Sequence, residues 1–279
     1  MRIFVAGASG VLGCAFLPLA LAAGHEVVGM ARSSQGAATI EALGGTPVVA
    51  DAFDREAVTA AVVESRPDVV VNLLTDLGSG TSASNARIRV EAGATLVEAA
   101  QAAGSDRVIA ESISWVHPPS PETADESTPL DVDSGEPRRT TILAVESLES
   151  ATLAGPNGVV LRFGQLYGPG TWYARDGRFA ELARAGGLPA TETVTSFVHA
   201  EDAAAAVLLA LDWPAGVYDV VDDEPAAGTE WGPVFARAVG APDPAPSTSG
   251  DLGRPVSNAA ARALGWAPAR RSWREFLGA

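Results

Sequence analysis

Short apolar runs alternate with longer stretches of helical spacing along residues 1–165. Apolar runs bounded by glycine or proline are typical of strands buried on both faces. The helical stretches between them predict helices on both faces of a parallel sheet. The expected strands are 2–6, 25–30, 45–50, 67–74, 106–112 and 158–163, and the expected helices are 11–23, 35–43, 54–65, 84–103 and 138–154.

This alternation predicts an α/β fold, a Rossmann-type doubly wound parallel sheet with a small C-terminal substrate lobe. The composition changes at Gly168, a helical run returns at 195–212, and a last helix is expected around 272–277. We expect a dinucleotide-binding domain at 1–167 that also receives 195–221. The substrate lobe is then formed by 168–194 and 222–279, whose proline- and glycine-rich loops are suited to covering a substrate.

Composition narrows the function classes. The chain has 279 residues, 47% of them hydrophobic, and a formal net charge of −15. Without a basic cluster, binding to a nucleic-acid backbone is not expected. The single cysteine, Cys14, and three widely spaced histidines predict neither a disulfide nor a metal site. The apolar run 11–23 is too short to cross a bilayer, so we expect a cytoplasmic protein without a membrane partner.

A glycine-rich turn joins the first expected strand to the first helix. Gly7, Gly10 and Gly13 fit a GxxGxxG pattern that lets the chain reverse, admits a pyrophosphate and packs helix against strand. The helix N-terminus adds free N–H groups and a partial positive charge. The turn, with Ser9, Val11 and Leu12, is therefore the predicted phosphate site of a dinucleotide.

The ends of the following strands carry the other cofactor candidates. The second strand ends in Arg32 and Ser33 where NAD-selective sites have an acidic residue, and a guanidinium suits a 2′-phosphate. This favours NADPH, with NADH as the alternative and a solvated surface arginine as the simpler explanation. Further expected cofactor contacts, at the ends of the third and fourth strands, are Asp51, Ala52, Leu73, Leu74 and Thr75.

Five segments in order carry a family resemblance: VAGASGVLG at 5–13, LRFGQLYGPG at 161–170, SFVHAEDAAAAVLLAL at 196–211, GVYDVVDDEP at 216–225 and LGWAPARRSWREFL at 264–277. The chain resembles the extended and atypical short-chain dehydrogenase/reductase superfamily, in its NAD(P)-dependent epimerase-like branch. The resemblance implies a nicotinamide cofactor, with Phe163 and Gln165 beside it. It also implies that 84–103 and 138–154 form the face of a homodimer.

The catalytic positions of this superfamily are changed. Its YxxxK pair and the glutamate that follows match Thr141, Val145 and Glu149. Its catalytic Ser/Thr matches Ile113, and its active-site asparagine matches Arg89. The catalytic candidates that remain are the hydroxyls of Ser112, Ser114 and Thr141, although the serines could equally satisfy backbone groups.

In the superfamily the tyrosine protonates the substrate oxygen as hydride arrives. A positioned general acid contributes roughly 10²–10⁴ in rate, whereas orientation alone can contribute about 7–11 kcal/mol. Hydride transfer without Tyr and Lys is therefore feasible if a phenol beside the substrate carbonyl stabilises the oxygen. In this respect the chain resembles atypical ketoreductases that tailor angucyclinone-type polyketides, such as that of simocyclinone biosynthesis. The resulting hypothesis is an NADPH-dependent ketoreductase of an antibiotic-type pathway, acting on an aromatic polyketide or quinone-like ketone.

Aromatic and histidine side chains after the fifth strand are candidates for contact with a planar substrate. These are Trp115, His117 and Tyr167, which could equally belong to the core or, for His117, be solvated. Two other functions remain open. A cofactor-sensing protein resembling the NmrA-like regulators would bind NADPH without turnover. A sugar-nucleotide epimerase or dehydratase would need the tyrosine as a base, which Thr141 does not supply.

Overall fold

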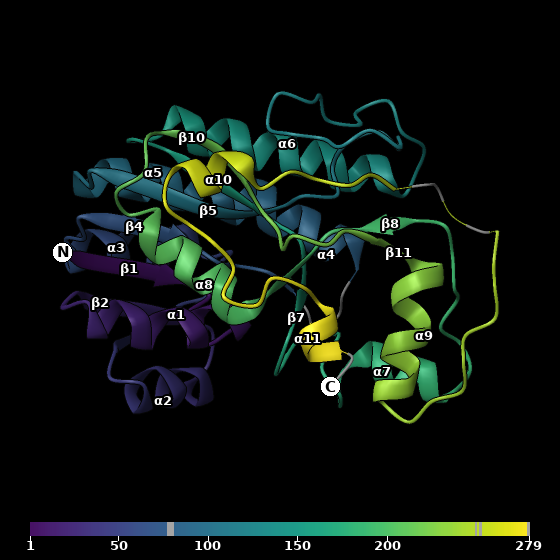
Figure 1. Ribbon diagram of the computed structural model, residues 1–279. Helices are drawn as coiled ribbons and strands as arrows, with labels where there is room; N and C mark the ends of the chain where they lie inside the picture. Colours follow the sequence, from purple (N-terminus) through teal and green to yellow (C-terminus); the bar gives the residue numbers. More distant parts are fainter. Residues whose placement is uncertain (77–80, 249, 251–252, 278–279) are drawn as a thin grey trace. The chain divides into compact units, whose positions relative to one another are not determined.

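The computed structural model describes residues 1–76, 81–248, 250 and 253–277 (Figure 1). Its central feature is a seven-stranded sheet with the strand order β10-β6-β5-β4-β1-β2-β3. The strands are β1 (Arg2–Ala6), β2 (Glu26–Ala31), β3 (Thr46–Val49), β4 (Val69–Asn72), β5 (Arg107–Ile113), β6 (Val159–Phe163) and β10 (Gly216–Val220). The pairs from β3 to β5 are parallel, which confirms the expected Rossmann-type fold.

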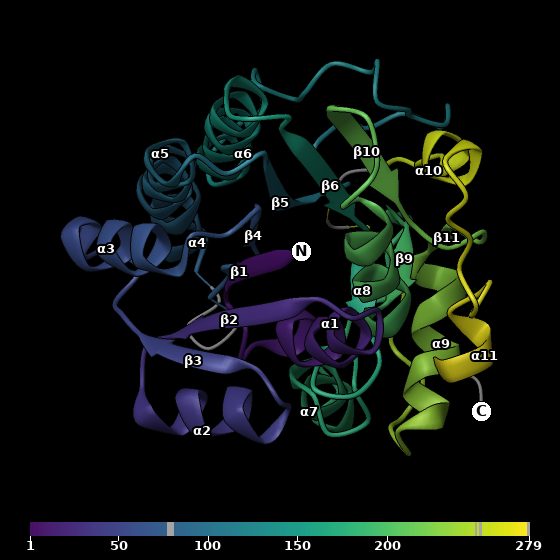
Figure 2. The ribbon, with the colours of Figure 1, turned by 90° about the vertical axis from the view of Figure 1, so that its left-hand side faces the viewer.

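Helices cover both faces of this sheet, as Figure 2 shows for α1 on one face and α3 and α5 on the other. The helices of this part are α1 (Val11–Ala22), α2 (Ser34–Ala42), α3 (Arg55–Ser65), α4 (Ser82–Arg87), α5 (Gly93–Ala103), α6 (Arg138–Ala154) and α8 (Ala200–Leu209). Side-chain oxygens of Ser33, Asp54 and Thr81 cap the first turns of α2, α3 and α4. Gly104 ends α5 in the left-handed conformation.

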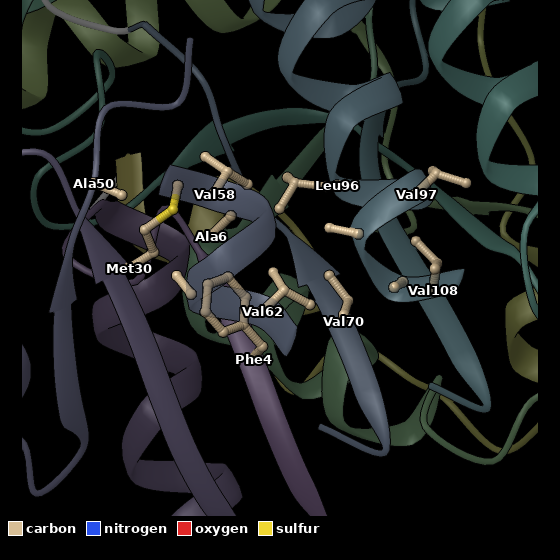
Figure 3. Packing of buried hydrophobic residues seen from close by; sticks show 13 residues of the cluster. Phe4, Ala6, Met30, Ala50, Val58, Val62, Val70, Leu96, Val97 and Val108 are labelled. Carbon is tan, nitrogen blue, oxygen red and sulfur yellow. The ribbon is translucent and has the colours of Figure 1, made fainter. Parts of the chain in front are cut away.

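The core between the sheet and α3 and α5 is apolar and buried (Figure 3). Phe4 of β1 and Val70 of β4 pack against Val62 of α3 and Leu96 of α5. Apolar residues occupy both faces of β1 and β4, because helices cover both faces. The continuous apolar runs of the sequence reflect this double coverage.

Two expected helices differ from the structure. The stretch 84–103 is interrupted by a π-helical turn, η1 (Ile88–Ala92), between α4 and α5. The stretch 195–212 begins as strand β9 (Phe197–His199), and its helix α8 starts only at Ala200. Ser196, Phe197 and Val198 are buried, and an apolar segment of this length does not distinguish a buried strand from a helix.

The chain divides into two compact units. The first is Met1–Ser112, Val132–Leu161 and Ala204–Val217, and the second is Ile113–Asp131, Arg162–Ala203 and Tyr218–Ala279. These limits differ from the expected domains, because 113–131, 162–167, 195–203 and 218–221 belong to the second unit. The segment after β5 is bound there by backbone hydrogen bonds from Ala124 to Pro255 and from Ser120 to Gly253. Backbone pairing between segments that are far apart in the sequence cannot be predicted from amino-acid composition, which was the basis for the expected domain limits.

The second unit has an aromatic core. Tyr173, Phe197, Trp231 and Phe235 pack mostly edge to face, and Trp273 is fully buried with them. The helices and strands of the second unit are β7 (Gln165–Tyr167), α7 (Arg178–Arg184), β8 (Val194–Thr195), β9, β11 (Ala226–Ala227), α9 (Gly228–Ala238), α10 (Ala259–Ala263) and α11 (Arg274–Leu277). The small sheets pair β7 with β9 and β8 with β11.

Within the described residues, each helix is too short or too polar to span a membrane.

Candidate cofactor and active site

The glycine turn lies between β1 and α1, as the sequence predicts. Gly7 has φ +84°, and a Cβ there would overlap the carbonyl oxygen of Leu73. A Cβ on Gly13 would overlap the carbonyl oxygens of Gly7 and Ala8. These two glycines therefore let the turn pack directly against backbone, which a larger residue would prevent.

The N-terminus of α1 is open. Gly10 is its N-cap, no side chain caps it, and its first turn carries no acidic residue. Gly10 is exposed, and a Cβ there would meet only the Gly7 carbonyl, at 3.2 Å. Free N–H groups and the positive end of a helix dipole fit an anionic pyrophosphate, so this cradle fits a dinucleotide. Val11 and Leu12 belong to that first turn, and Ser9 lies half-buried beside Gly36.

At the end of β2, Arg32 and Ser33 are both exposed, but their side chains differ in what they bind. The Ser33 hydroxyl accepts a hydrogen bond from the backbone N–H of Gly36 at 3.2 Å and so caps α2. The Arg32 guanidinium makes no hydrogen bond or ion pair with another described residue. Arg32 is therefore free to meet a 2′-phosphate, whereas Ser33 already has a structural role.

We expect Arg32→Ala to weaken NADPH binding roughly 10–100-fold and to leave NADH binding unchanged, because only NADPH carries the phosphate that a charge-assisted bond would hold. Fluorescence titration of both nucleotides measures this. Arg139→Ala, at another exposed arginine, is the control. Equal weakening of both nucleotides would contradict a role of Arg32 in choosing the phosphate.

The other cofactor candidates lie at the ends of β3 and β4. Asp51 is exposed, and its carboxylate accepts the backbone N–H of Phe53 at 2.9 Å, beside half-buried Ala52. Leu73 is buried under the glycine turn. Leu74 is half-buried, and exposed Thr75 donates its hydroxyl to Asn85 at 3.2 Å. The contact of these residues with a cofactor stays a prediction.

The positions of the missing Tyr and Lys lie on α6 and face inward. Thr141 and Val145 are both buried, and Glu149 one turn later is buried as well. Glu149 accepts a hydrogen bond from the hydroxyl of Ser112 on β5 at 2.7 Å. Because the Ser112 proton is held by Glu149, this hydroxyl can accept but not donate a further hydrogen bond. It is therefore poorly suited to protonate a substrate oxygen.

A buried carboxyl on β5 was not among the sequence candidates. Glu111 precedes Ser112, and its Oε2 atom is buried without a hydrogen-bond partner among the described residues. Burial raises the pKa of Glu111 to about 7, and the positive charge of Arg89 partly offsets that rise. The only sequence signal is a charged residue inside the apolar run 106–112.

The segment after β5 belongs to the second unit. Ser114 is buried, and its backbone N–H donates to the carbonyl of Phe163 at 2.9 Å. Trp115 keeps 40% of its surface exposed, so it is available to a planar ligand. His117 is buried, and its Nδ1 lies 3.2 Å from the carbonyl oxygen of Pro129. That bond needs a proton on Nδ1, so His117 has a structural partner and is not solvated.

Tyr167 is fully buried in the aromatic core of the second unit. Its ring meets Phe197 and His199 edge to face, with centroids 6.3 and 5.1 Å apart. Burial raises the pKa of the Tyr167 phenol. Phe163 is buried in β6, and Gln165 begins β7, where its backbone N–H donates to Ser196. Tyr167 thus stabilises the core, and Trp115 is the more accessible aromatic candidate.

The chain matches the NAD dependent epimerase/dehydratase family over residues 3–220, most of its length. It belongs to that family. Family membership agrees with the resemblance seen in the sequence and with the open glycine turn. The family is one of enzymes, which confirms the expectation of an enzyme, and its use of NAD supports a nicotinamide dinucleotide as cofactor.

A relative from a Streptomyces species, 3-diazoavenalumate denitrifying reductase, is 43% identical over an alignment that covers 100% of this chain and 99% of that protein. Among solved structures, UDP-glucose 4-epimerase of Thermus thermophilus in complex with NAD has a TM-score of 0.79, 24% identity and coverage of 100% and 97% of the two chains. UDP-glucose 4-epimerase of Thermotoga maritima with UDP-glucose has a TM-score of 0.81, 19% identity and coverage of 100% and 96%. These epimerases share the fold of this family member.

Proposed function

We propose that this protein is an NADPH-dependent reductase that removes a diazo group from a phenol-bearing aromatic compound as dinitrogen. The full-length relative named as a denitrifying reductase supports the reaction class. The free guanidinium of Arg32 supports NADPH as the reductant. The observation that carries the proposal is on α6, where Thr141 and Val145 are buried in place of a general acid and its lysine.

The chemistry explains why this face needs no acid. Reduction of a ketone leaves an alkoxide, which the family's tyrosine would protonate. A diazo group instead accepts hydride at its terminal nitrogen. The N–H hydrogen then passes as a proton to the ring carbon, which keeps the electron pair of the breaking C–N bond, and neutral N₂ leaves. The ring oxygen, a phenolate at this stage, takes its proton from water. One hydride is consumed for each N₂ released, and no alkoxide forms at the reacting centre.

The protein's own residues bind and orient in this proposal. The turn at Gly7, Gly10 and Gly13 and the N-terminus of α1 would hold the pyrophosphate, and Arg32 the 2′-phosphate. NADPH, when bound, supplies the hydride. Trp115 offers an exposed indole face for the aromatic ring of a substrate.

The second candidate is reduction of an aromatic ketone assisted by a neighbouring phenol. The same buried Thr141 supports it, because a substrate phenol would replace the acid that α6 lacks. The resemblance to atypical ketoreductases also favours it. The two candidate reactions differ in the atom that accepts the hydride, which is the terminal nitrogen of the diazo group in the first and the carbonyl carbon in the second.

The test measures NADPH oxidation and N₂ release with 3-diazo-4-hydroxybenzoate, beside two aromatic ketones whose peri hydroxyl is free or methylated. We expect equal amounts of N₂ and oxidised NADPH with the diazo compound, above the rate without enzyme. Turnover of the free-hydroxyl ketone alone would establish the second candidate. NADPH binding without any turnover would reject both and favour a cofactor sensor.

A further inference from the structure

Arg89 is half-buried, and its side chain has no hydrogen-bond or ion-pair partner among the described residues. It lies in the π-helical turn η1 of the first unit, and burial lowers the pKa of its guanidinium. No hydrogen bond or ion pair joins this guanidinium to another described residue. A guanidinium that is partly withdrawn from water loses hydration free energy unless its donors are satisfied. The arrangement therefore leaves donors available for a ligand.

Two carboxylates from different elements attract this cation. The attraction of Glu111 on β5 and of Glu149 on α6 partly restores the pKa of Arg89. Gly93, at the start of α5 next to η1, packs so closely on α6 that a Cβ there would lie 2.7 Å from Leu148 Cδ1. Carboxylates of both β5 and α6 thus attract the guanidinium, and no hydrogen bond joins it to either among the described residues.

The other charged side chains on elements packed against η1 lie nearer to solvent. Water screens these groups, so Glu111 and Glu149 dominate the potential at Arg89. The charged side chains nearer to solvent are the paired Arg87 and Glu91, the paired Arg55 and Glu98, and Arg138, Arg139 and Glu146.

The charge balance at Arg89 depends on Glu111. When Glu111 is protonated, Glu149 alone balances the guanidinium. When Glu111 is ionised, two carboxylates face one cation, and an added anion is repelled. Because the pKa of Glu111 is raised to about 7 by burial, both states are populated near neutral pH. An anion bound at Arg89 would favour protonated Glu111.

We propose that Arg89 binds an anionic oxygen of the aromatic substrate, and that Glu111 and Glu149 are the positioning residues that hold it. This assignment builds on the proposed reductase function. Arg89 matches the family's active-site asparagine in sequence, and Val145 leaves α6 without a lysine. A guanidinium can form two charge-assisted hydrogen bonds to one anionic group. That group is either the ring oxygen or a carboxylate substituent.

Arg89→Met and Arg89→Lys test the assignment, with Arg139→Met as the control at an exposed arginine. We expect Arg89→Met to raise the KM for 3-diazo-4-hydroxybenzoate by about 10–100-fold with a smaller change in kcat. Arg89→Lys should recover part of the loss, and the control should match the wild type. Unchanged KM in Arg89→Met, or loss of NADPH binding in both Arg89 variants, would overturn the assignment.

Substrate analogues identify the oxygen. Methylation of the ring hydroxyl, or esterification of the carboxylate, removes one anionic group at a time. The analogue that lacks the group bound by Arg89 should show the same KM in wild type and Arg89→Met. A difference between the two proteins with both analogues would contradict a single anionic contact.

Binding without turnover separates this inference from the proposed function. Calorimetry with 4-hydroxybenzoate and NADP⁺ measures anion affinity directly. We expect that affinity to weaken from pH 6 to pH 8 in the wild type and to vary little in Glu111→Gln. If the wild type binds 4-hydroxybenzoate through Arg89 but reduces no diazo compound, the proposed function fails and the anion site stands. Affinity that is independent of Arg89 would overturn the anion site itself.

Discussion

A protein with Gly13→Ala is expected to bind NADPH about 100-fold more weakly than the wild type, or not to bind it. The added Cβ would overlap the carbonyl oxygens of Gly7 and Ala8, which are backbone atoms that cannot rotate away. The turn must open to accept it, and the N-terminus of α1 then moves from the place where phosphate would bind. Overpacking of this kind also costs about 1–3 kcal/mol of stability. Fluorescence titration and thermal unfolding measure the two effects.

Gly135→Ala is the matched control, because a Cβ at Gly135 would meet no atom within 4 Å. It should leave both NADPH affinity and melting temperature close to wild type. Wild-type NADPH affinity in Gly13→Ala would show that the glycine turn does not hold the pyrophosphate. Lower stability with unchanged affinity would lead to the same conclusion.

The second large effect concerns stability against pH. Glu111→Gln should stabilise the protein at pH 8 and change little at pH 4. The pKa of Glu111 is raised to about 7, so the folded state binds a proton that the unfolded state has already lost above pH 4.5. Stability from this group is therefore full below pH 4.5 and is lost as pH rises through 7. The size is on the order of 3 kcal/mol, and glutamine removes the charge at nearly constant shape.

Urea unfolding at pH 4, 6 and 8 measures this difference. Glu146→Gln on α6 is the control, since Glu146 is exposed and its charge is screened. The gain for Glu111→Gln should grow with pH, whereas the control should stay near zero throughout. A gain that is the same at all three pH values would mean that packing, not charge, limits stability at this site.

Much of the fold could be predicted because its determinants are local. The glycine turn follows directly from spacing, and α6 begins and ends at the expected residues 138 and 154. The misplaced elements depend on tertiary contacts. Residues 197–199 form β9 because they pair with β7 far along the chain, from Gln165 to Phe197 and from Tyr167 to His199. No local pattern distinguishes that pairing from the start of α8.

The features of the candidate site also fall into those that local sequence predicts and those that depend on tertiary contacts. The loss of Tyr and Lys at Thr141 and Val145 is visible in sequence, because it depends only on spacing within one helix. The Ser112–Glu149 hydrogen bond and the burial of Glu111 arise from the approach of β5 to other elements. The sequence leaves Tyr167 open between a substrate contact and the core, and in the structure it packs among Phe197 and His199, which come from a distant segment.

The π-helical turn at Ile88–Ala92 affects how this chain is compared with its relatives. A turn closed by i→i+5 bonds holds one residue more than an α-helical turn. Each such residue rotates the positions that follow by about 100° around the helix axis. An ungapped alignment to a relative with a continuous α-helix would therefore pair side chains that face different directions. A one-residue gap within 88–92 restores the register. Residues on either side of the gap are then paired with residues of the relative that point in the same direction.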